Sequence, residues 1–219
     1  MTKIKHHLTE ELLIGYAAGT LPEAFSLVVA THLSMCDACR AAANAHEEVG
    51  GALLDRDTHV AMSDGALQAT LQLIQNTPRD PKDAIKAKIV HPSGVFPTPL
   101  QDYVGGDLDA VKWRPIGLGV RQAVLPTGKG ATVRLLHIPA GSAVPDHGHN
   151  GTELTLVLQG AFRDEEDRFG PGDVEVADED LNHTPVAEIG EDCICLAATD
   201  APLKFNSIIP RLAQPFLRI

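Results

Sequence analysis

Apolar positions in residues 9–77 recur at the spacing of α-helices. The segment Thr20-Leu21-Pro22-Glu23 is typical of a helix start, in which Thr20 caps the helix and Glu23 closes a capping box. Gly50-Gly51 is expected to end a later helix. The pattern therefore predicts four helices: one after Thr9, one after Pro22, one from Asp37 to Val49 and one from Ser63 to Asn76.

The pattern changes to short β-type runs from about residue 100, with turn signals such as Gly170-Pro171-Gly172-Asp173 between them. Many short, evenly spaced strands favour a sandwich or jelly roll. Five prolines among residues 78–99 indicate a semi-rigid linker. The predicted fold is α + β in two domains, an all-α domain of residues 1–77 and an all-β barrel of residues 100–219. The predicted strands are Val120–Leu125, Ala131–Ile138, Leu154–Leu158, Val174–Val176 and Cys193–Ala197.

Charge and composition narrow the classes of function. The 219 residues carry a net charge of -11, and acidic residues outnumber basic ones in both predicted domains. Nucleic-acid binders neutralise phosphates with basic patches, so we expect no nucleic-acid partner, and the acidic helical domain suits a basic protein instead. The sequence has no long apolar run and no apolar leader, so we expect a cytoplasmic protein without a membrane span.

The helical domain contains a metal-ligand pattern, His32-x3-Cys36-x2-Cys39. His32 and Cys36 lie four positions apart and so share a helical face, and Cys39 lies one further turn away. Imidazoles and thiolates are the ligands that a tetrahedral zinc site prefers. The fourth ligand would come from His6 or His7, and the residues alone leave that choice open. The alternative without a metal is a buried cysteine pair beside an unrelated histidine.

This segment resembles the zinc anti-sigma family, whose signature is His-x3-Cys-x2-Cys with an upstream histidine. The resemblance implies zinc on His7, His32, Cys36 and Cys39, in a domain that wraps an extracytoplasmic-function sigma factor. Some members with a redox switch carry additional cysteines in this domain. Here Cys36 and Cys39 are the only two, which argues against zinc release by disulfide formation.

A second ligand pattern lies in the barrel. His147 and His149 are two apart on an extended segment and point to the same side, and Glu153 can face the same interior. With Gly141 and Gly160 these residues resemble the first cupin motif. His183 stands at the histidine of the second motif, although Asp178 and Asp180 replace that motif's usual proline and glycine. Such a ligand set suits zinc or another divalent transition metal.

Cys193 and Cys195 are two apart on a predicted strand, so both face the same side. Cysteine is among the residues most often buried, which favours a pair of core thiols over a redox pair. In the cytoplasm, all four cysteines are expected to be ligands or buried thiols rather than disulfides.

The order of parts, a zinc anti-sigma domain followed by a cupin, resembles the ChrR-type anti-sigma factors over nearly the whole chain. The resemblance implies a non-enzymatic inhibitor that releases its sigma factor when singlet oxygen or related oxidants appear. The alternative is a mononuclear metal cupin dioxygenase or isomerase with an accessory zinc domain. The apolar face of Leu67, Leu71 and Ile74 discriminates between them, because an enzyme would cover it with the barrel and an anti-sigma factor would leave it available.

Overall fold

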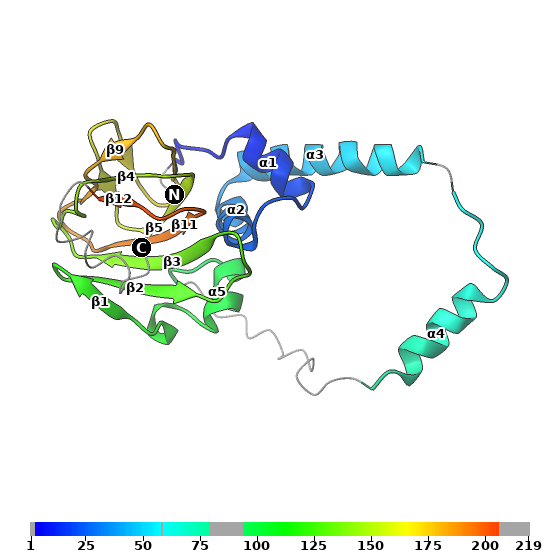
Figure 1. The fold of residues 1–219 in the computed structure, drawn as a ribbon. Helices are drawn as coiled ribbons and strands as arrows, with labels where there is room; N and C mark the ends of the chain where they lie inside the picture. Colours follow the sequence, from blue (N-terminus) through cyan, green and yellow to red (C-terminus); the bar gives the residue numbers. More distant parts are fainter. Residues whose placement is uncertain (1–2, 58, 79–93, 206–219) are drawn as a thin grey trace.

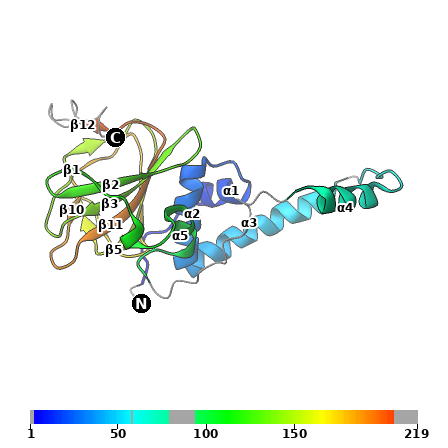
Figure 2. The same ribbon diagram turned by 90° about the horizontal axis from the view of Figure 1, so that it is seen from below.

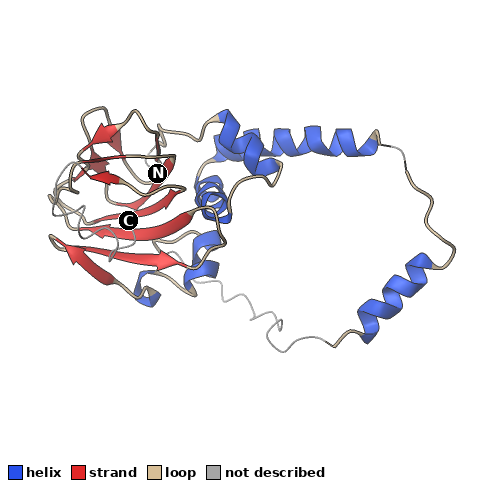
Figure 3. Cartoon of the chain, viewed as in Figure 1, coloured by secondary structure: helices blue, strands red, loops and turns tan. Residues whose placement is uncertain are grey.

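The computed structural model describes residues 3–57, 59–78 and 94–205. Helices and strands segregate into two parts that lie against each other (Figure 1, Figure 3). The helical part contains α1 (Glu10–Ala17), α2 (Glu23–Met35), α3 (Asp37–Asp55) and α4 (Ala66–Asn76). In the chain, α5 (Thr98–Val104) and a short 3-10 helix, η2 (Leu108–Ala110), come directly before the strands. The predicted α + β fold is therefore confirmed.

The barrel consists of one large sheet and two small ones. The large sheet has the order β1-β2-β3-β11-β5-β8, and the small sheets have the orders β10-β6-β7 and β12-β4-β9. Every strand pair is antiparallel, as expected for a jelly roll, and all five predicted strands are present. The strands are β1 (Arg114–Gly117), β2 (Val120–Leu125), β3 (Thr132–Ile138), β4 (His147–Gly148), β5 (Glu153–Gln159), β6 (Phe162–Arg163), β7 (Arg168–Phe169), β8 (Val174–Ala177), β9 (Asn182–His183), β10 (Val186–Ala187), β11 (Cys193–Thr199) and β12 (Lys204–Phe205).

A single apolar core joins the helices to the outer face of the large sheet. Val28 and Val29 of α2 are fully buried and belong to the same cluster as Leu135 of β3 and Leu196 of β11. Helix α2 therefore lies between the sheet and α1, as Figure 2 shows. A second cluster, which includes Val157, Phe162 and Cys193, fills the inside of the barrel.

Three details of the predicted helix ends are wrong. Helix α4 begins at Ala66 rather than at Ser63, because Gly65 before it has a left-handed backbone. Helix α3 continues through Gly50-Gly51 to Asp55, because two glycines cost a helix only about 1 kcal/mol each and both keep helical backbone here. The capping box before α2 does not form, since Thr20 Oγ1 donates to the Gly15 carbonyl instead. Glu23 turns to the barrel, where its carboxylate accepts hydrogen bonds from the Tyr103 hydroxyl and the Gly128 N–H.

The predicted linker is only partly a linker in the described residues. Phe96 and Leu100 are buried in the shared core, and α5 begins at Thr98 and contacts α2. Residues 79–93 of the predicted linker lie outside the described residues. The domain boundaries at residues 77 and 100 stay predictions.

The far end of α3 and the whole of α4 project away from the barrel (Figure 1, Figure 2). Helix α4 has no buried residue, and Leu67 and Ile74 are 72% and 66% exposed. Among the described helices, none combines the length and the apolar character needed to cross a membrane.

The shared core predicts that the two parts unfold together. Leu100→Ala should lower the free energy of unfolding by about 2–5 kcal/mol, because it leaves a cavity at a fully buried site. Calorimetry should show one transition at a lower temperature. The matched control is Leu67→Ala at an exposed site, which should change stability by less than about 0.5 kcal/mol. Two separate transitions, of which Leu100→Ala shifts only one, would contradict the prediction.

Candidate metal centres

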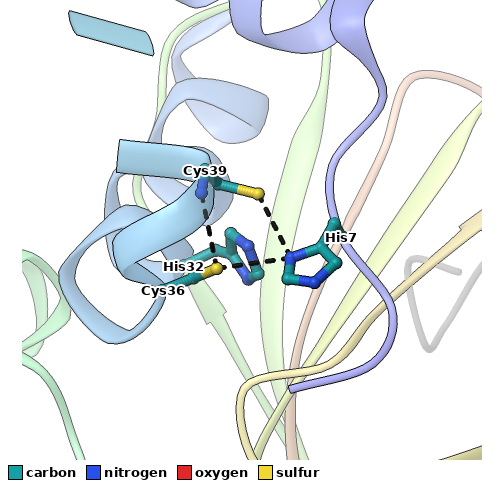
Figure 4. A group of neighbouring side chains, drawn as sticks. All are labelled: His7, His32, Cys36 and Cys39. Atoms are coloured by element: carbon teal, nitrogen blue, oxygen red, sulfur yellow. Dashed lines mark hydrogen bonds between the residues drawn. The ribbon is translucent and has the colours of Figure 1, made fainter. Parts of the chain in front are cut away.

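The first candidate centre, site 1, lies where α2 ends and α3 begins. His32 occupies the last turn of α2, Cys36 separates the two helices, and Cys39 sits in the first turn of α3. His7 approaches from the segment before α1, as Figure 4 shows. One nitrogen or sulfur atom from each of the four residues lies within 4.8 Å of all the others. The structure thus brings together the four predicted ligands of the helical domain.

Distances within site 1 identify the atoms that face one another. His7 Nδ1 lies 3.3 Å from Cys36 Sγ and 3.5 Å from Cys39 Sγ. His32 Nδ1 lies 2.9 Å from the Gly172 carbonyl oxygen, which can only accept, so Nδ1 carries the proton and Nε2 the lone pair. His32 Nε2 is buried and finds no hydrogen-bond partner among the described residues. A cation bound by two sulfurs, His7 Nδ1 and His32 Nε2 would satisfy this orphaned atom.

The electrostatics of site 1 also suit a cation. Burial lowers the pKa of His32 to about 4, so the imidazole is neutral and able to ligate. Burial raises the pKa of the Cys39 thiol to about 11, so a thiolate there requires a compensating positive charge. Both thiols lie at the N-terminus of α3, where the helix dipole favours negative charge. These groups fit a thiolate-binding metal such as zinc.

His6, the other candidate for the fourth position, faces a different environment. Its ring packs on Phe169 with centroids 4.4 Å apart, and its Nε2 lies 3.5 Å from Asp167 Oδ2. In the structure His7, and not His6, therefore lies with the other three residues of site 1.

The second candidate centre, site 2, lies inside the barrel. His147 on β4 is directly opposite His183 on β9, and His149 follows β4 in the chain. The Nε2 atom of His183 lies 3.3 Å from that of His147 and 3.4 Å from that of His149. All three imidazoles are at least 96% buried, and burial lowers the pKa of both His147 and His149. Three convergent imidazole nitrogens fit a divalent transition metal.

Other groups orient two of these three rings from behind. His147 Nδ1 lies 2.9 Å from the Pro145 carbonyl oxygen, and His183 Nδ1 lies 3.2 Å from Asp164 and 3.1 Å from Glu175. Carboxylates or carbonyls on the far nitrogen are the usual support of a metal-binding histidine. Burial lowers the pKa of His183, but hydrogen bonds to Glu175 and Asp164 outweigh it and raise the pKa to about 9. Burial raises the pKa of Glu175 to about 7.

The sequence does not single out Asp164 and Glu175. Glu175 sits between Val174 and Val176, and an apolar–polar–apolar run is ordinarily read as a strand with its polar residue in solvent. In a barrel the inner face is buried as well, so Glu175 is only 5% exposed. The one signal that could have pointed to these two carboxylates is that a metal-binding histidine needs an acceptor for its second ring nitrogen.

Glu153 stands beside the three-imidazole group rather than in it. Its Oε2 lies 3.8 Å from His149 Nδ1, on the side opposite to the convergent Nε2 atoms, and its Oε1 accepts a hydrogen bond from Thr155. His149 Nδ1 has no hydrogen-bond partner among the described residues. The ligand role of Glu153 stays a prediction.

Cys193 and Cys195 both face the inside of the barrel from β11. They are fully buried free thiols with sulfurs 3.5 Å apart. The hydrogen bond with Cys193, which holds the Cys195 thiol as the donor, and burial raise the pKa of Cys195. The pair behaves as core, in keeping with the prediction of buried thiols.

Comparison with known proteins gives matches to both halves of the chain. Residues 101–202 match the family model of the ChrR cupin-like domain. The anti-sigma-E factor ChrR of Cereibacter sphaeroides is 61% identical over 216 residues, which cover 99% of each chain. A crystal structure of Rhodobacter sphaeroides SigE in complex with the anti-sigma ChrR matches with a TM-score of 0.78 and 58% identity, covering 90% of this chain and 100% of that chain.

Proposed function

Because the chain belongs to the family of ChrR anti-sigma factors, we propose that it binds and inhibits an extracytoplasmic-function sigma factor. The similar chain of known structure is bound to a sigma factor, SigE, which supports this partner. Family membership places the chain among regulators rather than enzymes. Since sigma factors act on RNA polymerase in the cytoplasm, we propose that the protein works there.

One structural observation carries the proposal: the projecting arm of α3 and α4 exposes an apolar surface. Large apolar side chains left exposed along projecting helices mark a site of protein interaction. The enzyme alternative requires the barrel to cover the face of Leu67, Leu71 and Ile74, and these side chains are 72%, 43% and 66% exposed. We call this surface the arm face. Its exposed members are Val49, Leu53, Leu54, Leu67, Leu71, Leu73 and Ile74.

For site 1, we propose a structural zinc held by His7, His32, Cys36 and Cys39. The donor set of two thiols and two imidazoles, the orphaned His32 Nε2 and the high pKa of Cys39 support it. The ligands join the segment before α1 to the corner between α2 and α3, so the metal would fix the angle from which the arm leaves the helical domain.

For site 2, we propose a signal-sensing centre that contains zinc or another divalent transition metal. His147 lies on β4, His149 directly after it, and His183 on the neighbouring strand β9, so shared ligation would hold these segments together. We assign Glu153 as the fourth ligand, which requires its carboxylate to move from His149 Nδ1 toward the Nε2 atoms. Singlet oxygen is the proposed signal, and loss of ligation would let the barrel shift against the helical domain.

The first prediction from the proposed function concerns zinc. Cys36→Ala should remove one zinc ion per chain and reduce the helix content, because the energy of binding a structural zinc is folding energy. Elemental analysis and circular dichroism measure the two effects. Cys193→Ala, which removes a buried cysteine of the barrel, is the control and should keep that zinc. Stoichiometric zinc at site 1 in a Cys36→Ala, Cys39→Ala double variant would contradict the assignment.

The second prediction concerns the arm face. Leu67→Asp should weaken sigma binding at least about tenfold, because it buries an unpaired charge in the interface. Titration calorimetry with the purified sigma factor measures the dissociation constant. Leu118→Asp, at a barrel position that is 74% exposed, is the matched control and should bind like the wild type. Equal affinity in both variants would exclude the arm face as the docking surface.

The third prediction concerns the signal. In cells with His147→Ala and Glu153→Ala together, the ratio of sigma-dependent transcription with and without singlet oxygen should fall toward one, since the group that changes state is gone. His59→Ala, an exposed histidine outside both sites, should keep the wild-type ratio. An unchanged ratio in the double variant would show that site 2 does not carry the signal. Steady turnover of a small substrate by the purified protein would favour the enzyme alternative.

A further inference from the structure

The turn between β7 and β8 is the part of the barrel that touches site 1. The Gly172 carbonyl oxygen lies 2.9 Å from Nδ1 of the ligand His32 and thereby directs the lone pair of Nε2 at the other ligands. Gly172 has a φ of +92°, and a Cβ there would lie 2.6 Å from the Ile4 side chain. Only glycine allows the turn to approach this closely.

The next residue, Asp173, holds the other end of site 1. Its side chain is buried, and its Oδ1 accepts hydrogen bonds from the backbone N–H groups of Lys5 (2.6 Å) and His6 (3.0 Å), while its Oδ2 accepts one from Gly170. The Val174 N–H donates to the His6 carbonyl. The segment immediately before the ligand His7 forms no helix or strand, so these bonds fix its position.

The same stretch of chain then enters the barrel and reaches site 2. Glu175 is the second residue of β8, and its Oε1 lies 3.1 Å from Nδ1 of His183. Four consecutive residues, 172–175, therefore contact a ligand of site 1, the segment before another ligand, and a ligand of site 2. Val174 and Glu175 begin β8, and backbone hydrogen bonds to Val157 of β5 hold Gly172 and Asp173 directly before it. A displacement of Glu175 is therefore passed on to Asp173 and Gly172.

We propose that the stretch Gly172–Glu175 couples the two sites, so that site 1 holds its metal more tightly when site 2 is occupied. The groups behind a metal-binding histidine set its orientation, and misplacing them weakens binding. Coupling between binding sites is reciprocal, so occupancy of site 1 would tighten site 2 equally. This inference rests on the metals proposed for both sites.

The test measures metal release from site 1 in the full-length protein. Cobalt(II) bound by cysteine gives a thiolate charge-transfer absorption, and site 1 is the candidate centre with cysteines among the described residues. The decay of this absorption in excess chelator gives the release rate for the wild type, Asp173→Asn, His147→Ala and the double variant. An asparagine keeps the size of the aspartate but cannot accept from all three N–H groups.

We expect release about tenfold faster in Asp173→Asn, the lower end of the usual effect of such supporting groups. His147→Ala, which removes a ligand of site 2 that does not belong to the connecting stretch, should also accelerate release. The double variant should release no faster than Asp173→Asn alone, because the connection is already broken. His149→Ala repeats the experiment at site 2 should His147→Ala not fold.

Asp192→Asn is the matched control. Asp192 also accepts a hydrogen bond from a backbone N–H, that of Ala140, but lies outside the stretch Gly172–Glu175. It should release cobalt at the wild-type rate. A wild-type rate in either Asp173→Asn or the site 2 variant would overturn the coupling and leave the metal at site 1 standing. A wild-type protein without the thiolate absorption would overturn the metal at site 1 and the coupling together.

Discussion

The packing of α2 on the outer face of the large sheet is the interaction on which the rest of the structure depends. Its buried residues include Phe25, Val28 and Val29, and each such side chain contributes about 1.5–3 kcal/mol when removed from water. The same helix carries His32 in its last turn. The apolar contact therefore determines where the imidazole meets Gly172 in the turn between β7 and β8. The helical part thus shares its apolar core with the large sheet of the barrel.

The two candidate centres meet the problem of buried polar groups in different ways. At site 1, burial disfavours the charged forms of His32 and Cys39, so a bound cation would stabilise the Cys39 thiolate. Site 2 places carboxylates behind His183 and a carbonyl behind His147, which fixes the nitrogen that each ring offers. The group that directs the His32 lone pair at site 1 comes from Gly172, 140 positions away, whereas Pro145 orients His147 at site 2 from two positions away.

Local patterns predicted the elements and the ligand spacing well, because both follow from short-range geometry. His32 and Cys36 keep the i, i+4 relation at the end of α2, where the Cys36 N–H donates to the His32 carbonyl, and the run Val120–Leu125 became β2 without change. Partners far apart in sequence were beyond reach: Gly172 meets His32 across 140 positions. The Gly50-Gly51 pair misled because a glycine ends a helix only where the chain needs a left-handed residue, and here helix α3 continues.

The arm formed by α3 and α4 has little support of its own. An isolated helix of 11 residues is marginal in water, and α4 buries no residue against the rest of the described chain. A partner that covered the arm face would supply the missing apolar contacts, and the entropy lost on ordering the arm would offset part of the binding free energy. A change of about 1.4 kcal/mol already alters affinity tenfold. In the proposed mechanism, a shift of the barrel that slightly misplaces His7 and His32 would act at the base of the arm, where α3 begins. A modest perturbation there would therefore be sufficient to change the affinity for the partner.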